Sequence, residues 1–462
     1  MGDKIESKKL AKAAGVSTVP GHIGVITTAK EAVKIADKIG YPVMIKASAG
    51  GGGKGMRMAH SANEVADGYA TAMREARSSF GDDRVFIEKF VTSPRHIEIQ
   101  VLADQDGQCI HLNERECSIQ RRNQKIIEEA PSPFLDNTTR EAMGAEAIRL
   151  AKAVGYYSAG TVEFIVDDAR NFYFLEMNTR LQVEHPVTEW VSGVDIVAQQ
   201  FRIAAGESIA DLAVQNNGYA MEARINAERI LKQGDGSLAF RPHPGKIDQC
   251  HFPEEEGVEI IAAVGPGKFI SPYYDSMVAQ IIVYAESRDA AAAKLADYLD
   301  RVKLTGICSN IPLLRKILVD EIFLAGVYDT NYLPELLLRS DIDALIESIE
   351  RGSGTTDAEI DLDSLRIEAS DELKVLAPAT AIFYSAPSPS EPEYVSVGDE
   401  VSLDHTLCQL EAMKIFSPLC LGDFNADGEL YDPTKRYQVT RINMSNGQQV
   451  NVGDLLFVVK PV

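Results

Sequence analysis

Residues 50–55 contain five glycines among six positions, and this run restricts what the chain can fold into more than any other segment. Glycine weakens regular helices and strands, so the run predicts a loop whose backbone approaches another molecule closely. Successive backbone N–H groups of such a loop can surround phosphate oxygens, while Lys46 and Lys54 can add positive charge. The GxxxxGK[ST] spacing of a P-loop is absent, as is the acidic ribose partner of a dinucleotide fingerprint. A flexible surface loop is the alternative interpretation.

The sequence around this loop predicts an α/β or α+β body. At 462 residues the chain is too long for one hydrophobic core, so we expect two or three domains. From residue 30 to residue 339, short β-branched runs alternate with helical patterns. Strands are predicted at 85–90, 96–102 and 172–177, and helices are predicted at 62–78 and 138–154.

Charge and cysteine content exclude several classes of function. The formal net charge of −22 argues against nucleic-acid binding, because phosphate contacts require a basic surface. The apolar runs are too short to cross a bilayer, so no membrane association is expected. No targeting leader is visible at the N-terminus. The six cysteines lie far apart without a CxxC pair, which indicates reduced thiols in a cytosol-like compartment.

Two carboxylates and an amide mark a candidate metal site. Residues 160–166 and 172–178 are predicted to form two strands of a hairpin. Glu163 would then face the same side as Glu176 and Asn178, which share a face because side chains alternate along a strand. Carboxylate oxygens are the ligands that Mg²⁺ uses when it also bridges nucleotide phosphates. Solvated or salt-bridged carboxylates are the alternative at such positions.

A small all-β domain is predicted at the C-terminus, with residues 411–414 (Glu-Ala-Met-Lys) at a hairpin tip. Such a tip exposes Lys414 to a modifying enzyme, and an ordinary surface lysine is the alternative. Strands are predicted before the tip at 379–384 and 394–399, and a hairpin-like pair is predicted after it at 443–450 and 453–459.

Several further segments carry a family resemblance. Together with the glycine run, they resemble, in the same order, the ATP-grasp core of biotin carboxylases over residues 1–339. The segment from residue 375 to the end resembles biotin carboxyl carrier domains. The resemblance implies an α/β and α+β fold, in which an ATP-grasp body with a biotin carboxylase C-terminal subdomain precedes a small all-β biotinyl (barrel-sandwich) domain. The segments that carry it are 115–125, 128–131, 178–189, 221–228 and 272–277.

The resemblance also implies domain boundaries. The ATP-grasp domain is expected over 1–214, with a mobile lid over 19–91, and the C-terminal subdomain over 215–340. An acidic flexible linker is expected over 341–374, followed by the biotinyl domain over 375–462. Biotin carboxylases carry a further N-terminal subdomain ahead of the matching sequence. The chain is therefore expected to lack that lobe, which leaves the activity of this polypeptide alone open.

Carried over residue by residue, the resemblance implies one reaction site. Glu184 would act as general base on bicarbonate, Arg224 would stabilise the biotin enolate, and Lys125 would lie beside the bicarbonate. Biotin would be attached to Lys414. Arg180, Gln182 and Val183 would bind bicarbonate, with Arg180 also catalytic, and Glu163, Glu176 and Asn178 would bind Mg²⁺ or Mn²⁺. The ATP-binding residues would be Lys4, Lys46, Gly51, Gly52, Gly53, Glu88, Lys89, Val91, His96 and Gln120.

The implied function is ATP- and bicarbonate-dependent carboxylation of biotin on Lys414, by the biotin carboxylase and carrier subunit of an acyl-CoA carboxylase. The expected partners are a separate carboxyltransferase subunit that uses an acyl-CoA (acetyl- or propionyl-CoA) and a biotin protein ligase, in a homo- or hetero-oligomer. The expected location is the cytoplasm, or the mitochondrial matrix for a processed eukaryotic protein. Two alternatives stay open: a catalytically incomplete carrier or scaffold, and the same half-reaction serving pyruvate or urea.

Overall fold

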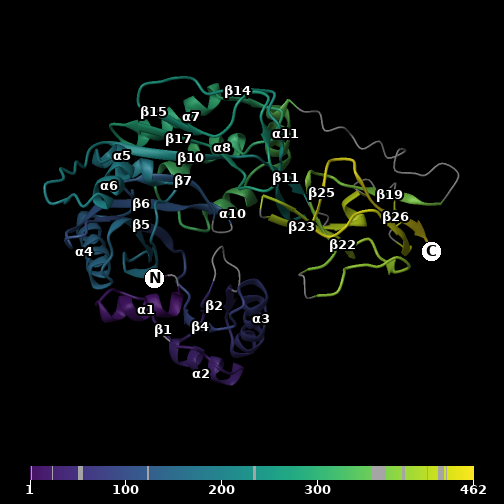
Figure 1. Ribbon diagram of the computed structural model, residues 1–462, viewed down its shortest axis with the longest axis horizontal. Coiled ribbons are helices and arrows are strands. Elements are labelled where there is room, and N and C mark those ends of the chain that lie inside the picture. The colour runs from purple at the N-terminus through teal and green to yellow at the C-terminus, as the bar shows by residue number, and fades with distance from the viewer. Residues whose placement is uncertain are drawn as a thin grey trace.

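The computed structural model describes residues 1, 3–22, 24–49, 56–121, 124–232, 236–354, 371–387, 391–413, 415–424, 431–432 and 434–462. Figure 1 shows a small N-terminal sheet with helices below a body around a large sheet, and a C-terminal β domain at the right. Among the described residues, no helix combines the length and the hydropathy that crossing a bilayer requires.

The body is built on an eight-stranded antiparallel sheet with the strand order β15-β17-β10-β7-β6-β5-β8-β9. Strands β5 and β9 confirm the strands predicted at 96–102 and 172–177. The eight strands are β5 (Arg95–Ala103), β6 (Cys109–Arg121), β7 (Gln124–Ala130), β8 (Ser158–Val166), β9 (Phe172–Asn178), β10 (Tyr219–Asn226), β15 (Val258–Ala262) and β17 (Met277–Ala285).

Helices cover both faces of this sheet. In β5, Ile97 and Ile99 pack in one apolar cluster with Met143 of α4 (Asn137–Ala153), which confirms the helix predicted at 138–154. Glu98 alternates with them on the opposite face and is also buried. On that side lie α5 (His185–Ser192) and α6 (Ile196–Ala204), while α1 (Lys4–Ala13) packs against β9 and α4. Charges on the covered face must therefore be paired within the protein.

The predicted lid forms a sheet of its own with the order β1-β4-β2-β3. Val43, Ile45 and Ile87 of the strands pack with Val65 and Tyr69 of α3 in its core. The glycine run lies outside the described residues, between β2 and β3, which pair as antiparallel strands. Mobility of the lid stays a prediction. The elements are β1 (Gly21–His22), α2 (Ala29–Ile39), β2 (Val43–Ala47), β3 (Met56–Ala59), α3 (Ala62–Phe80) and β4 (Val85–Lys89).

The segment after β10 adds short strands and five helices to the far end of the sheet. Its apolar cluster joins Ile225 and Ile281 of the sheet to Leu295 of α7 and Leu314 of α8. A hairpin of β11 and β12 projects from this part. The elements are β11 (Glu228–Lys232), β12 (Leu238–Pro242), β13 (Gly245–Lys246), β14 (Gln249–His251), β16 (Phe269–Ile270), α7 (Arg288–Arg301), β18 (Lys303–Thr305), α8 (Ile311–Leu318), α9 (Glu321–Leu324), α10 (Tyr332–Leu338) and α11 (Ile342–Ser353).

The prediction of a flexible linker over 341–374 is wrong for about the first third of this range. Residues 342–353 form α11, whose Leu345 and Ile349 are buried against the same apolar cluster. Asp341 caps this helix by accepting a hydrogen bond from the Ala344 N–H. The apolar residues of α11 recur at helical spacing. The linker was predicted because the segment is acidic, and that prediction did not take the helical spacing into account. Residues 355–370 lie outside the described residues.

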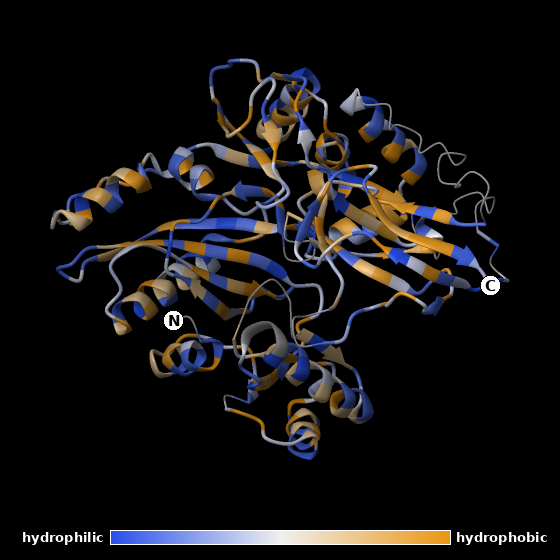
Figure 2. Ribbon diagram, turned by 45° about the vertical axis from the view of Figure 1, so that its right-hand side comes forward, coloured by the Kyte–Doolittle hydropathy of each residue, from blue (hydrophilic) through white to orange (hydrophobic). Residues whose placement is uncertain are grey.

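The C-terminal domain consists of two four-stranded sheets, β19-β26-β24-β21 and β23-β22-β20-β25. Figure 2 shows hydrophobic residues along these strands, and Phe383, Phe457 and Val439 are buried between the sheets. The strands are β19 (Leu373–Leu376), β20 (Ala381–Tyr384), β21 (Glu400–Val401), β22 (Thr406–Ala412), β23 (Ile415–Cys420), β24 (Tyr437–Ile442), β25 (Gln448–Val450) and β26 (Leu455–Pro461), with a 3-10 turn, η2 (Leu421–Phe424).

Three strand predictions in this domain have different outcomes. The strand at 379–384 is confirmed as β20. Residues 394–399 are not a strand, because Ser396 and Asp399 hydrogen-bond each other in a turn. Strands β25 and β26 do not pair as a hairpin, because β25 pairs with β20 while β26 pairs with β19 and β24. The chain between them crosses from one sheet to the other, which local sequence patterns do not distinguish from a hairpin turn.

Arg115 of β6 is completely buried and ties the sheet to the segment that follows β9. Its guanidinium donates to Glu98 Oε1 at 2.7 Å, which places one buried cation beside one buried carboxylate. The other acceptors are Gln100 (2.8 Å), Thr188 (2.9 Å), Thr161 (3.1 Å) and Gln182 (2.8 Å). Arg115 therefore cross-links three strands, α5 and a loop.

Replacing Arg115→Met should lower the free energy of unfolding by about 3–5 kcal/mol, because it leaves buried acceptors and part of the Glu98 charge without a partner. Urea denaturation followed by circular dichroism measures this change. Arg351→Gln is the matched control: Arg351 pairs with Glu347 on the surface of α11, and its loss should change stability by less than about 0.5 kcal/mol. Equal stabilities of the two variants would contradict the role given to Arg115.

Candidate functional site

A cavity of about 1490 Å³ opens between the lid sheet and the body sheet. Its walls come from β2 and β4 of the lid, from β5 to β9 of the body, from the β11–β12 hairpin, and from Met413 of the C-terminal domain. The predicted site residues that line it are Lys4, Lys46, Glu88, Lys89, Val91, His96, Gln120, Lys125, Glu163, Glu176, Asn178, Arg180, Gln182, Val183, Glu184 and Arg224. The remaining predicted residues, Gly51, Gly52, Gly53 and Lys414, lie outside the described part of the chain.

The three predicted metal ligands lie together on the β8–β9 hairpin. Glu163 stands directly opposite Glu176 in the register of the two strands, as the sequence predicts. Asn178 Nδ2 donates to Glu163 Oε1 at 2.7 Å, and His96 Nε2 lies 3.0 Å from Glu163 Oε2. Burial opposes the ionisation of Glu163, but the charge and hydrogen bond of His96 outweigh it and hold the pKa at about 2. The site offers carboxylate oxygens and one amide oxygen.

Lys125 joins two carboxylates in the middle of the cavity. Its Nζ lies 2.5 Å from Glu98 Oε2 and also contacts Glu184 Oε1. Arg224 holds the other oxygen of Glu184, with Nη2 2.9 Å from Oε2. Burial works against the charge on Glu184, but Lys125, Arg224 and Arg115 outweigh it and keep the pKa of this carboxyl far below its usual range. Glu184 is therefore an ionised carboxylate between two cations.

The loop between β9 and α5 carries the residues predicted to bind bicarbonate. Gln182 Nε2 donates to Glu163 Oε1 at 2.9 Å, which links the loop to the metal ligands. The Val183 carbonyl accepts from Gln280 Nε2 at 2.9 Å. Glu184 is the N-cap residue of α5. The loop is thus fixed from both sides of the cavity.

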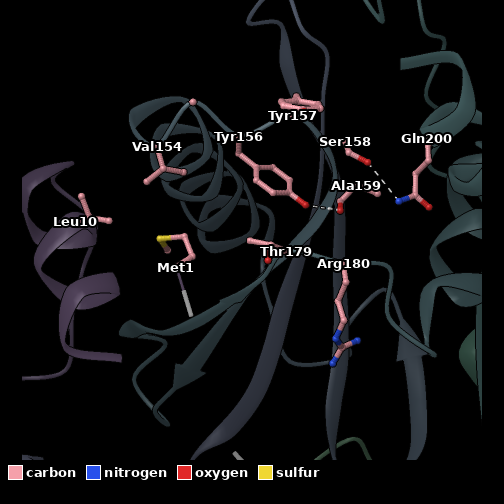
Figure 3. A pocket seen from close by; sticks show the side chains of 11 residues that line it. Met1, Leu10, Val154, Tyr156, Tyr157, Ser158, Ala159, Thr179, Arg180 and Gln200 are labelled. Carbon is pink, nitrogen blue, oxygen red and sulfur yellow. Dashed lines mark hydrogen bonds between the residues drawn. The ribbon is translucent and has the colours of Figure 1, made fainter. Parts of the chain in front are cut away.

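Arg180 lies in the exposed first part of this loop, whereas Gln182 and Glu184 are buried. It also lines a second hollow of about 670 Å³ next to Met1, Leu10 and Tyr157. Figure 3 shows the Arg180 guanidinium pointing away from Tyr157 and Ser158. The second hollow contains none of the other predicted site residues, which all line the larger cavity or lie outside the described part of the chain.

Two family models match this body. "Carbamoyl-phosphate synthase L chain, ATP binding domain" matches residues 3–212, and "Biotin carboxylase C-terminal domain" matches residues 222–335. The 2-oxoglutarate carboxylase small subunit of Hydrogenobacter thermophilus is 47% identical to the chain, and the match covers 72% of this chain and 70% of that subunit. The chain belongs to the biotin carboxylase family.

Other relatives of the chain are longer. The mitochondrial propionyl-CoA carboxylase alpha chain of Homo sapiens is 53% identical over 73% of this chain and 46% of its own length. The chain thus spans about half the length of the curated propionyl-CoA carboxylase chain that it matches.

Solved structures show the same fold. The biotin carboxylase domain dimer of the Hydrogenobacter thermophilus 2-oxoglutarate carboxylase, in complex with MgADP, ADP and bicarbonate, has a TM-score of 0.69 at 47% identity, over 72% of this chain and 73% of that one. The biotin carboxylase from Campylobacter jejuni, in a β,γ-ATP complex, has a TM-score of 0.69 at 42% identity, over 72% and 74%. The expected ATP-grasp body with its C-terminal subdomain is confirmed.

Lys8 lies at the lid end of the cavity and was not among the residues predicted from the sequence. Lys8 and Lys46 both contact the buried carboxylate of Glu88, and Lys8 Nζ lies 5.0 Å from the centre of the Phe86 ring. Burial, with the nearby charges of Lys46 and Lys4, keeps the pKa of Lys8 well below its usual range. The available signal was the spacing of Lys4 and Lys8, which places them on one face of a helix.

Several buried polar residues that contact the predicted site residues were also not predicted from the sequence. Glu98 lies two residues after His96 in β5, so both face the cavity side of the sheet. Gln280 Nε2 donates to Glu222 Oε1 at 2.8 Å as well as to the Val183 carbonyl. Alternation along β5, β10 and β17 was the signal for these residues, because charged side chains at the inward positions of buried strands require partners.

Glu128 holds Arg224 in place from β7. Arg224 Nε donates to Glu128 Oε1 at 2.6 Å. Burial raises the pKa of Glu128 from its ordinary 4.5 to about 7, and the nearby Glu184 charge adds to the rise, while Arg224 and Lys125 oppose it. The side chain is therefore partly protonated near neutral pH.

The raised pKa of Glu128 predicts a pH dependence of stability. Between pH 4.5 and about pH 7, the folded protein keeps a proton on Glu128, whereas the unfolded chain has released it. The protonated Glu128 side chain therefore adds its full contribution to the free energy of unfolding below pH 4.5. This contribution is lost as the pH rises through about 7. We expect Glu128→Gln to remove it, so the variant should gain about 2 kcal/mol relative to the wild type between about pH 5.5 and about pH 8.

Urea denaturation of both proteins at the two pH values measures the gain. Glu347→Gln, at an exposed position of α11, provides the control and should show the same difference from the wild type at both pH values. A Glu128→Gln curve parallel to the wild type across this range would show that the buried carboxyl does not titrate there.

Proposed function

We propose that the chain carboxylates biotin attached to Lys414, using ATP, bicarbonate and Mg²⁺ or Mn²⁺. The observation that carries this proposal is the convergence of Glu184, Arg224 and Lys125 with the metal-ligand hairpin in one cavity, which Met413 also lines. Met413 is the residue directly before Lys414. The relatives support the same chemistry, since their names and structures include carboxylases with bound MgADP and bicarbonate.

In the proposed reaction, different residues act at the two ends of the cavity. Lys4, Lys46 and the glycine run would neutralise the ATP phosphates, and Glu88 with the backbone of Lys89 and Val91 would hold the adenine. Glu163, Glu176 and Asn178 would hold Mg²⁺ or Mn²⁺, because their oxygens suit a hard cation, and the ion would supply positive charge near the nucleotide phosphates. Phosphoryl transfer of this kind depends mainly on positioning and on charge neutralisation.

Glu184 would accept the proton of bicarbonate as a bicarbonate oxygen attacks the γ-phosphorus and the bond to the ADP oxygen breaks. A carboxylate held by two cations is a weak base. A bound anion that draws Lys125 and Arg224 toward itself would raise the pKa of Glu184 and make it a stronger base. The carboxyphosphate formed in this step would release CO₂ and phosphate within the cavity.

Arg224 would then stabilise the negative oxygen that develops on the ureido group of biotin. Its guanidinium stays charged under all relevant conditions and can form two parallel hydrogen bonds. When bound, biotin would supply a ureido nitrogen that gives up a proton to phosphate and takes up the carboxyl group. Glu128 and Glu184 fix the direction of the guanidinium before this step.

We propose that a carboxyltransferase subunit completes the reaction with an acyl-CoA, and that a biotin protein ligase modifies Lys414. The 53% identity to a propionyl-CoA carboxylase alpha chain supports this acceptor. The 47% identity to a 2-oxoglutarate carboxylase small subunit supports a 2-oxo acid as the alternative acceptor. Transfer of labelled bicarbonate to propionyl-CoA or to 2-oxoglutarate, with the cognate partner present, would decide between them. The proposed location is a bacterial cytoplasm or a mitochondrial matrix.

Replacing Glu184→Gln should lower bicarbonate-dependent ATP turnover by about 10²-fold or more, because the amide cannot accept the bicarbonate proton. ATP binding, measured by calorimetry, should change little. Glu207→Gln, at an exposed position after α6, provides the control and should retain full turnover. Unchanged turnover in Glu184→Gln would remove this residue from the role of base, and turnover independent of bicarbonate in the wild type would favour the scaffold alternative.

Replacing Lys414→Arg should abolish recognition by streptavidin after co-expression with a biotin protein ligase, because the guanidinium does not form the amide with biotin. Lys460→Arg, at an exposed position in the same β domain, should remain fully labelled. A blot of the intact protein measures the label. Streptavidin binding that persists in Lys414→Arg would show that biotin is attached elsewhere or is absent.

A further inference from the structure

Met413, at the tip of the β22–β23 hairpin, is buried against a part of the protein other than its own domain. Met413, at this tip, is only 3% exposed. It belongs to the apolar cluster that contains Phe240 of β12 and Leu337 of α10, and not to the core between the two C-terminal sheets. Removing a methionine side chain from water stabilises the contact that buries it. The position of Met413 therefore favours contact between the two domains.

Polar contacts surround this apolar anchor. The Met413 N–H donates to the carbonyl of Pro272, which lies in the segment before β17. The Tyr273 hydroxyl donates to Gln449 Oε1 of β25 at 2.9 Å. Arg241 Nη2 of β12 lies 3.9 Å from Asp423 Oδ1 of η2. The C-terminal domain thus meets the segment before β17 and the β11–β12 hairpin, in agreement with the contacts between β12 and β23 and with the position of β23 beside β11 in Figure 1.

We propose that Pro272, Tyr273 and Arg241 form a docking surface for the C-terminal β domain of the same chain, with Met413 as its anchor. The inference rests on the proposed function in one respect, namely that the neighbouring Lys414 carries biotin. It goes further by naming the contacts that set how the carrier hairpin enters the cavity. The residue before the biotinyl lysine is then a positioning residue for the reaction.

The chemistry of this surface suits a contact that forms and releases. One buried apolar side chain with a few partly exposed polar pairs is typical of small transient interfaces. A carrier that must also reach a carboxyltransferase needs such a contact. The domain of the same chain is the favoured occupant because covalent connection gives it a high effective concentration at the surface.

A disulfide trap tests the contact directly. The hydrogen bond between the Met413 N–H and the Pro272 carbonyl brings the two backbones close enough for a disulfide between cysteines at these positions. We expect Pro272→Cys combined with Met413→Cys to form an intrachain disulfide under mild oxidation, seen as an altered monomer band on a non-reducing gel. The yield should exceed by several-fold that of Pro272→Cys combined with Val397→Cys, since Val397 is an exposed residue elsewhere in the same domain.

The other outcomes of the trap overturn the proposal. A disulfide-linked dimer would show that the domain of a second copy occupies the surface. A yield no higher than that of the control pair would show that the contact does not form. Each single-cysteine variant gives the background from the six natural cysteines.

Hydrogen exchange at the hairpin tip gives a second test that leaves the hairpin unchanged. The Met413 N–H is bonded to Pro272 only in the docked arrangement, so its exchange reports docking. Tyr273→Ala combined with Arg241→Ala should accelerate exchange in a peptide spanning 411–416 by several-fold. Tyr274→Ala, at the 74% exposed neighbouring position, should not. Unchanged exchange in the double variant would overturn the docking surface.

Both readouts are independent of turnover and of biotin. Failure of the disulfide trap would therefore leave the carboxylation chemistry at Glu184 standing. Unchanged turnover in Glu184→Gln, which would overturn the role of Glu184 as base, would likewise leave the docking surface standing. The two proposals can be overturned separately.

Discussion

The pairing of buried charges across the body sheet is the constraint on which the rest of the structure depends. Glu98, Arg115, Lys125 and Glu184 share a region that water reaches little, where an unpaired charge is very costly. Each charge is balanced by one on another strand or on the loop after β9. The register of β5, β6 and β7 and the position of α5 are therefore linked, because a shift of one strand by one residue would leave these charges facing apolar side chains.

The same kind of pairing places two cations around one carboxylate at the lid end and in the centre of the cavity. At the lid end, Lys8 and Lys46 both contact Glu88, and in the centre Lys125 and Arg224 both contact Glu184. In each case a carboxylate of the protein occupies a place between two cations. Under the proposed function, an incoming phosphate or bicarbonate would compete with that carboxylate for the cations. The pKa of the displaced carboxyl would then rise, so anion binding and base strength at Glu184 would be coupled.

The sequence predicts many of the secondary-structure elements and the positions of the candidate metal ligands. It does not predict the buried partners of the site residues. Strands β5 and β9, helix α4 and the alignment of Glu163 with Glu176 follow from local alternation and periodicity. The partners behind the site, such as Glu128 for Arg224, depend on which strands lie side by side, and local patterns do not contain that information. The C-terminal domain shows the same limit, because the separation of β25 and β26 into two sheets is a property of the sandwich and not of the turn between them.

The position of Met413 shows how the two domains divide the task of placing a reactive group. The cavity supplies fixed charges, which only a well-packed sheet can hold in place. The C-terminal domain supplies an apolar anchor on a tight hairpin, where Met413 adopts a positive φ of 50°. This conformation is uncommon for a residue with a side chain, and it costs energy that burial of the methionine can offset. Rigid charges in one domain and a releasable apolar contact in the other would allow the biotin proposed at Lys414 to enter the site without becoming trapped there.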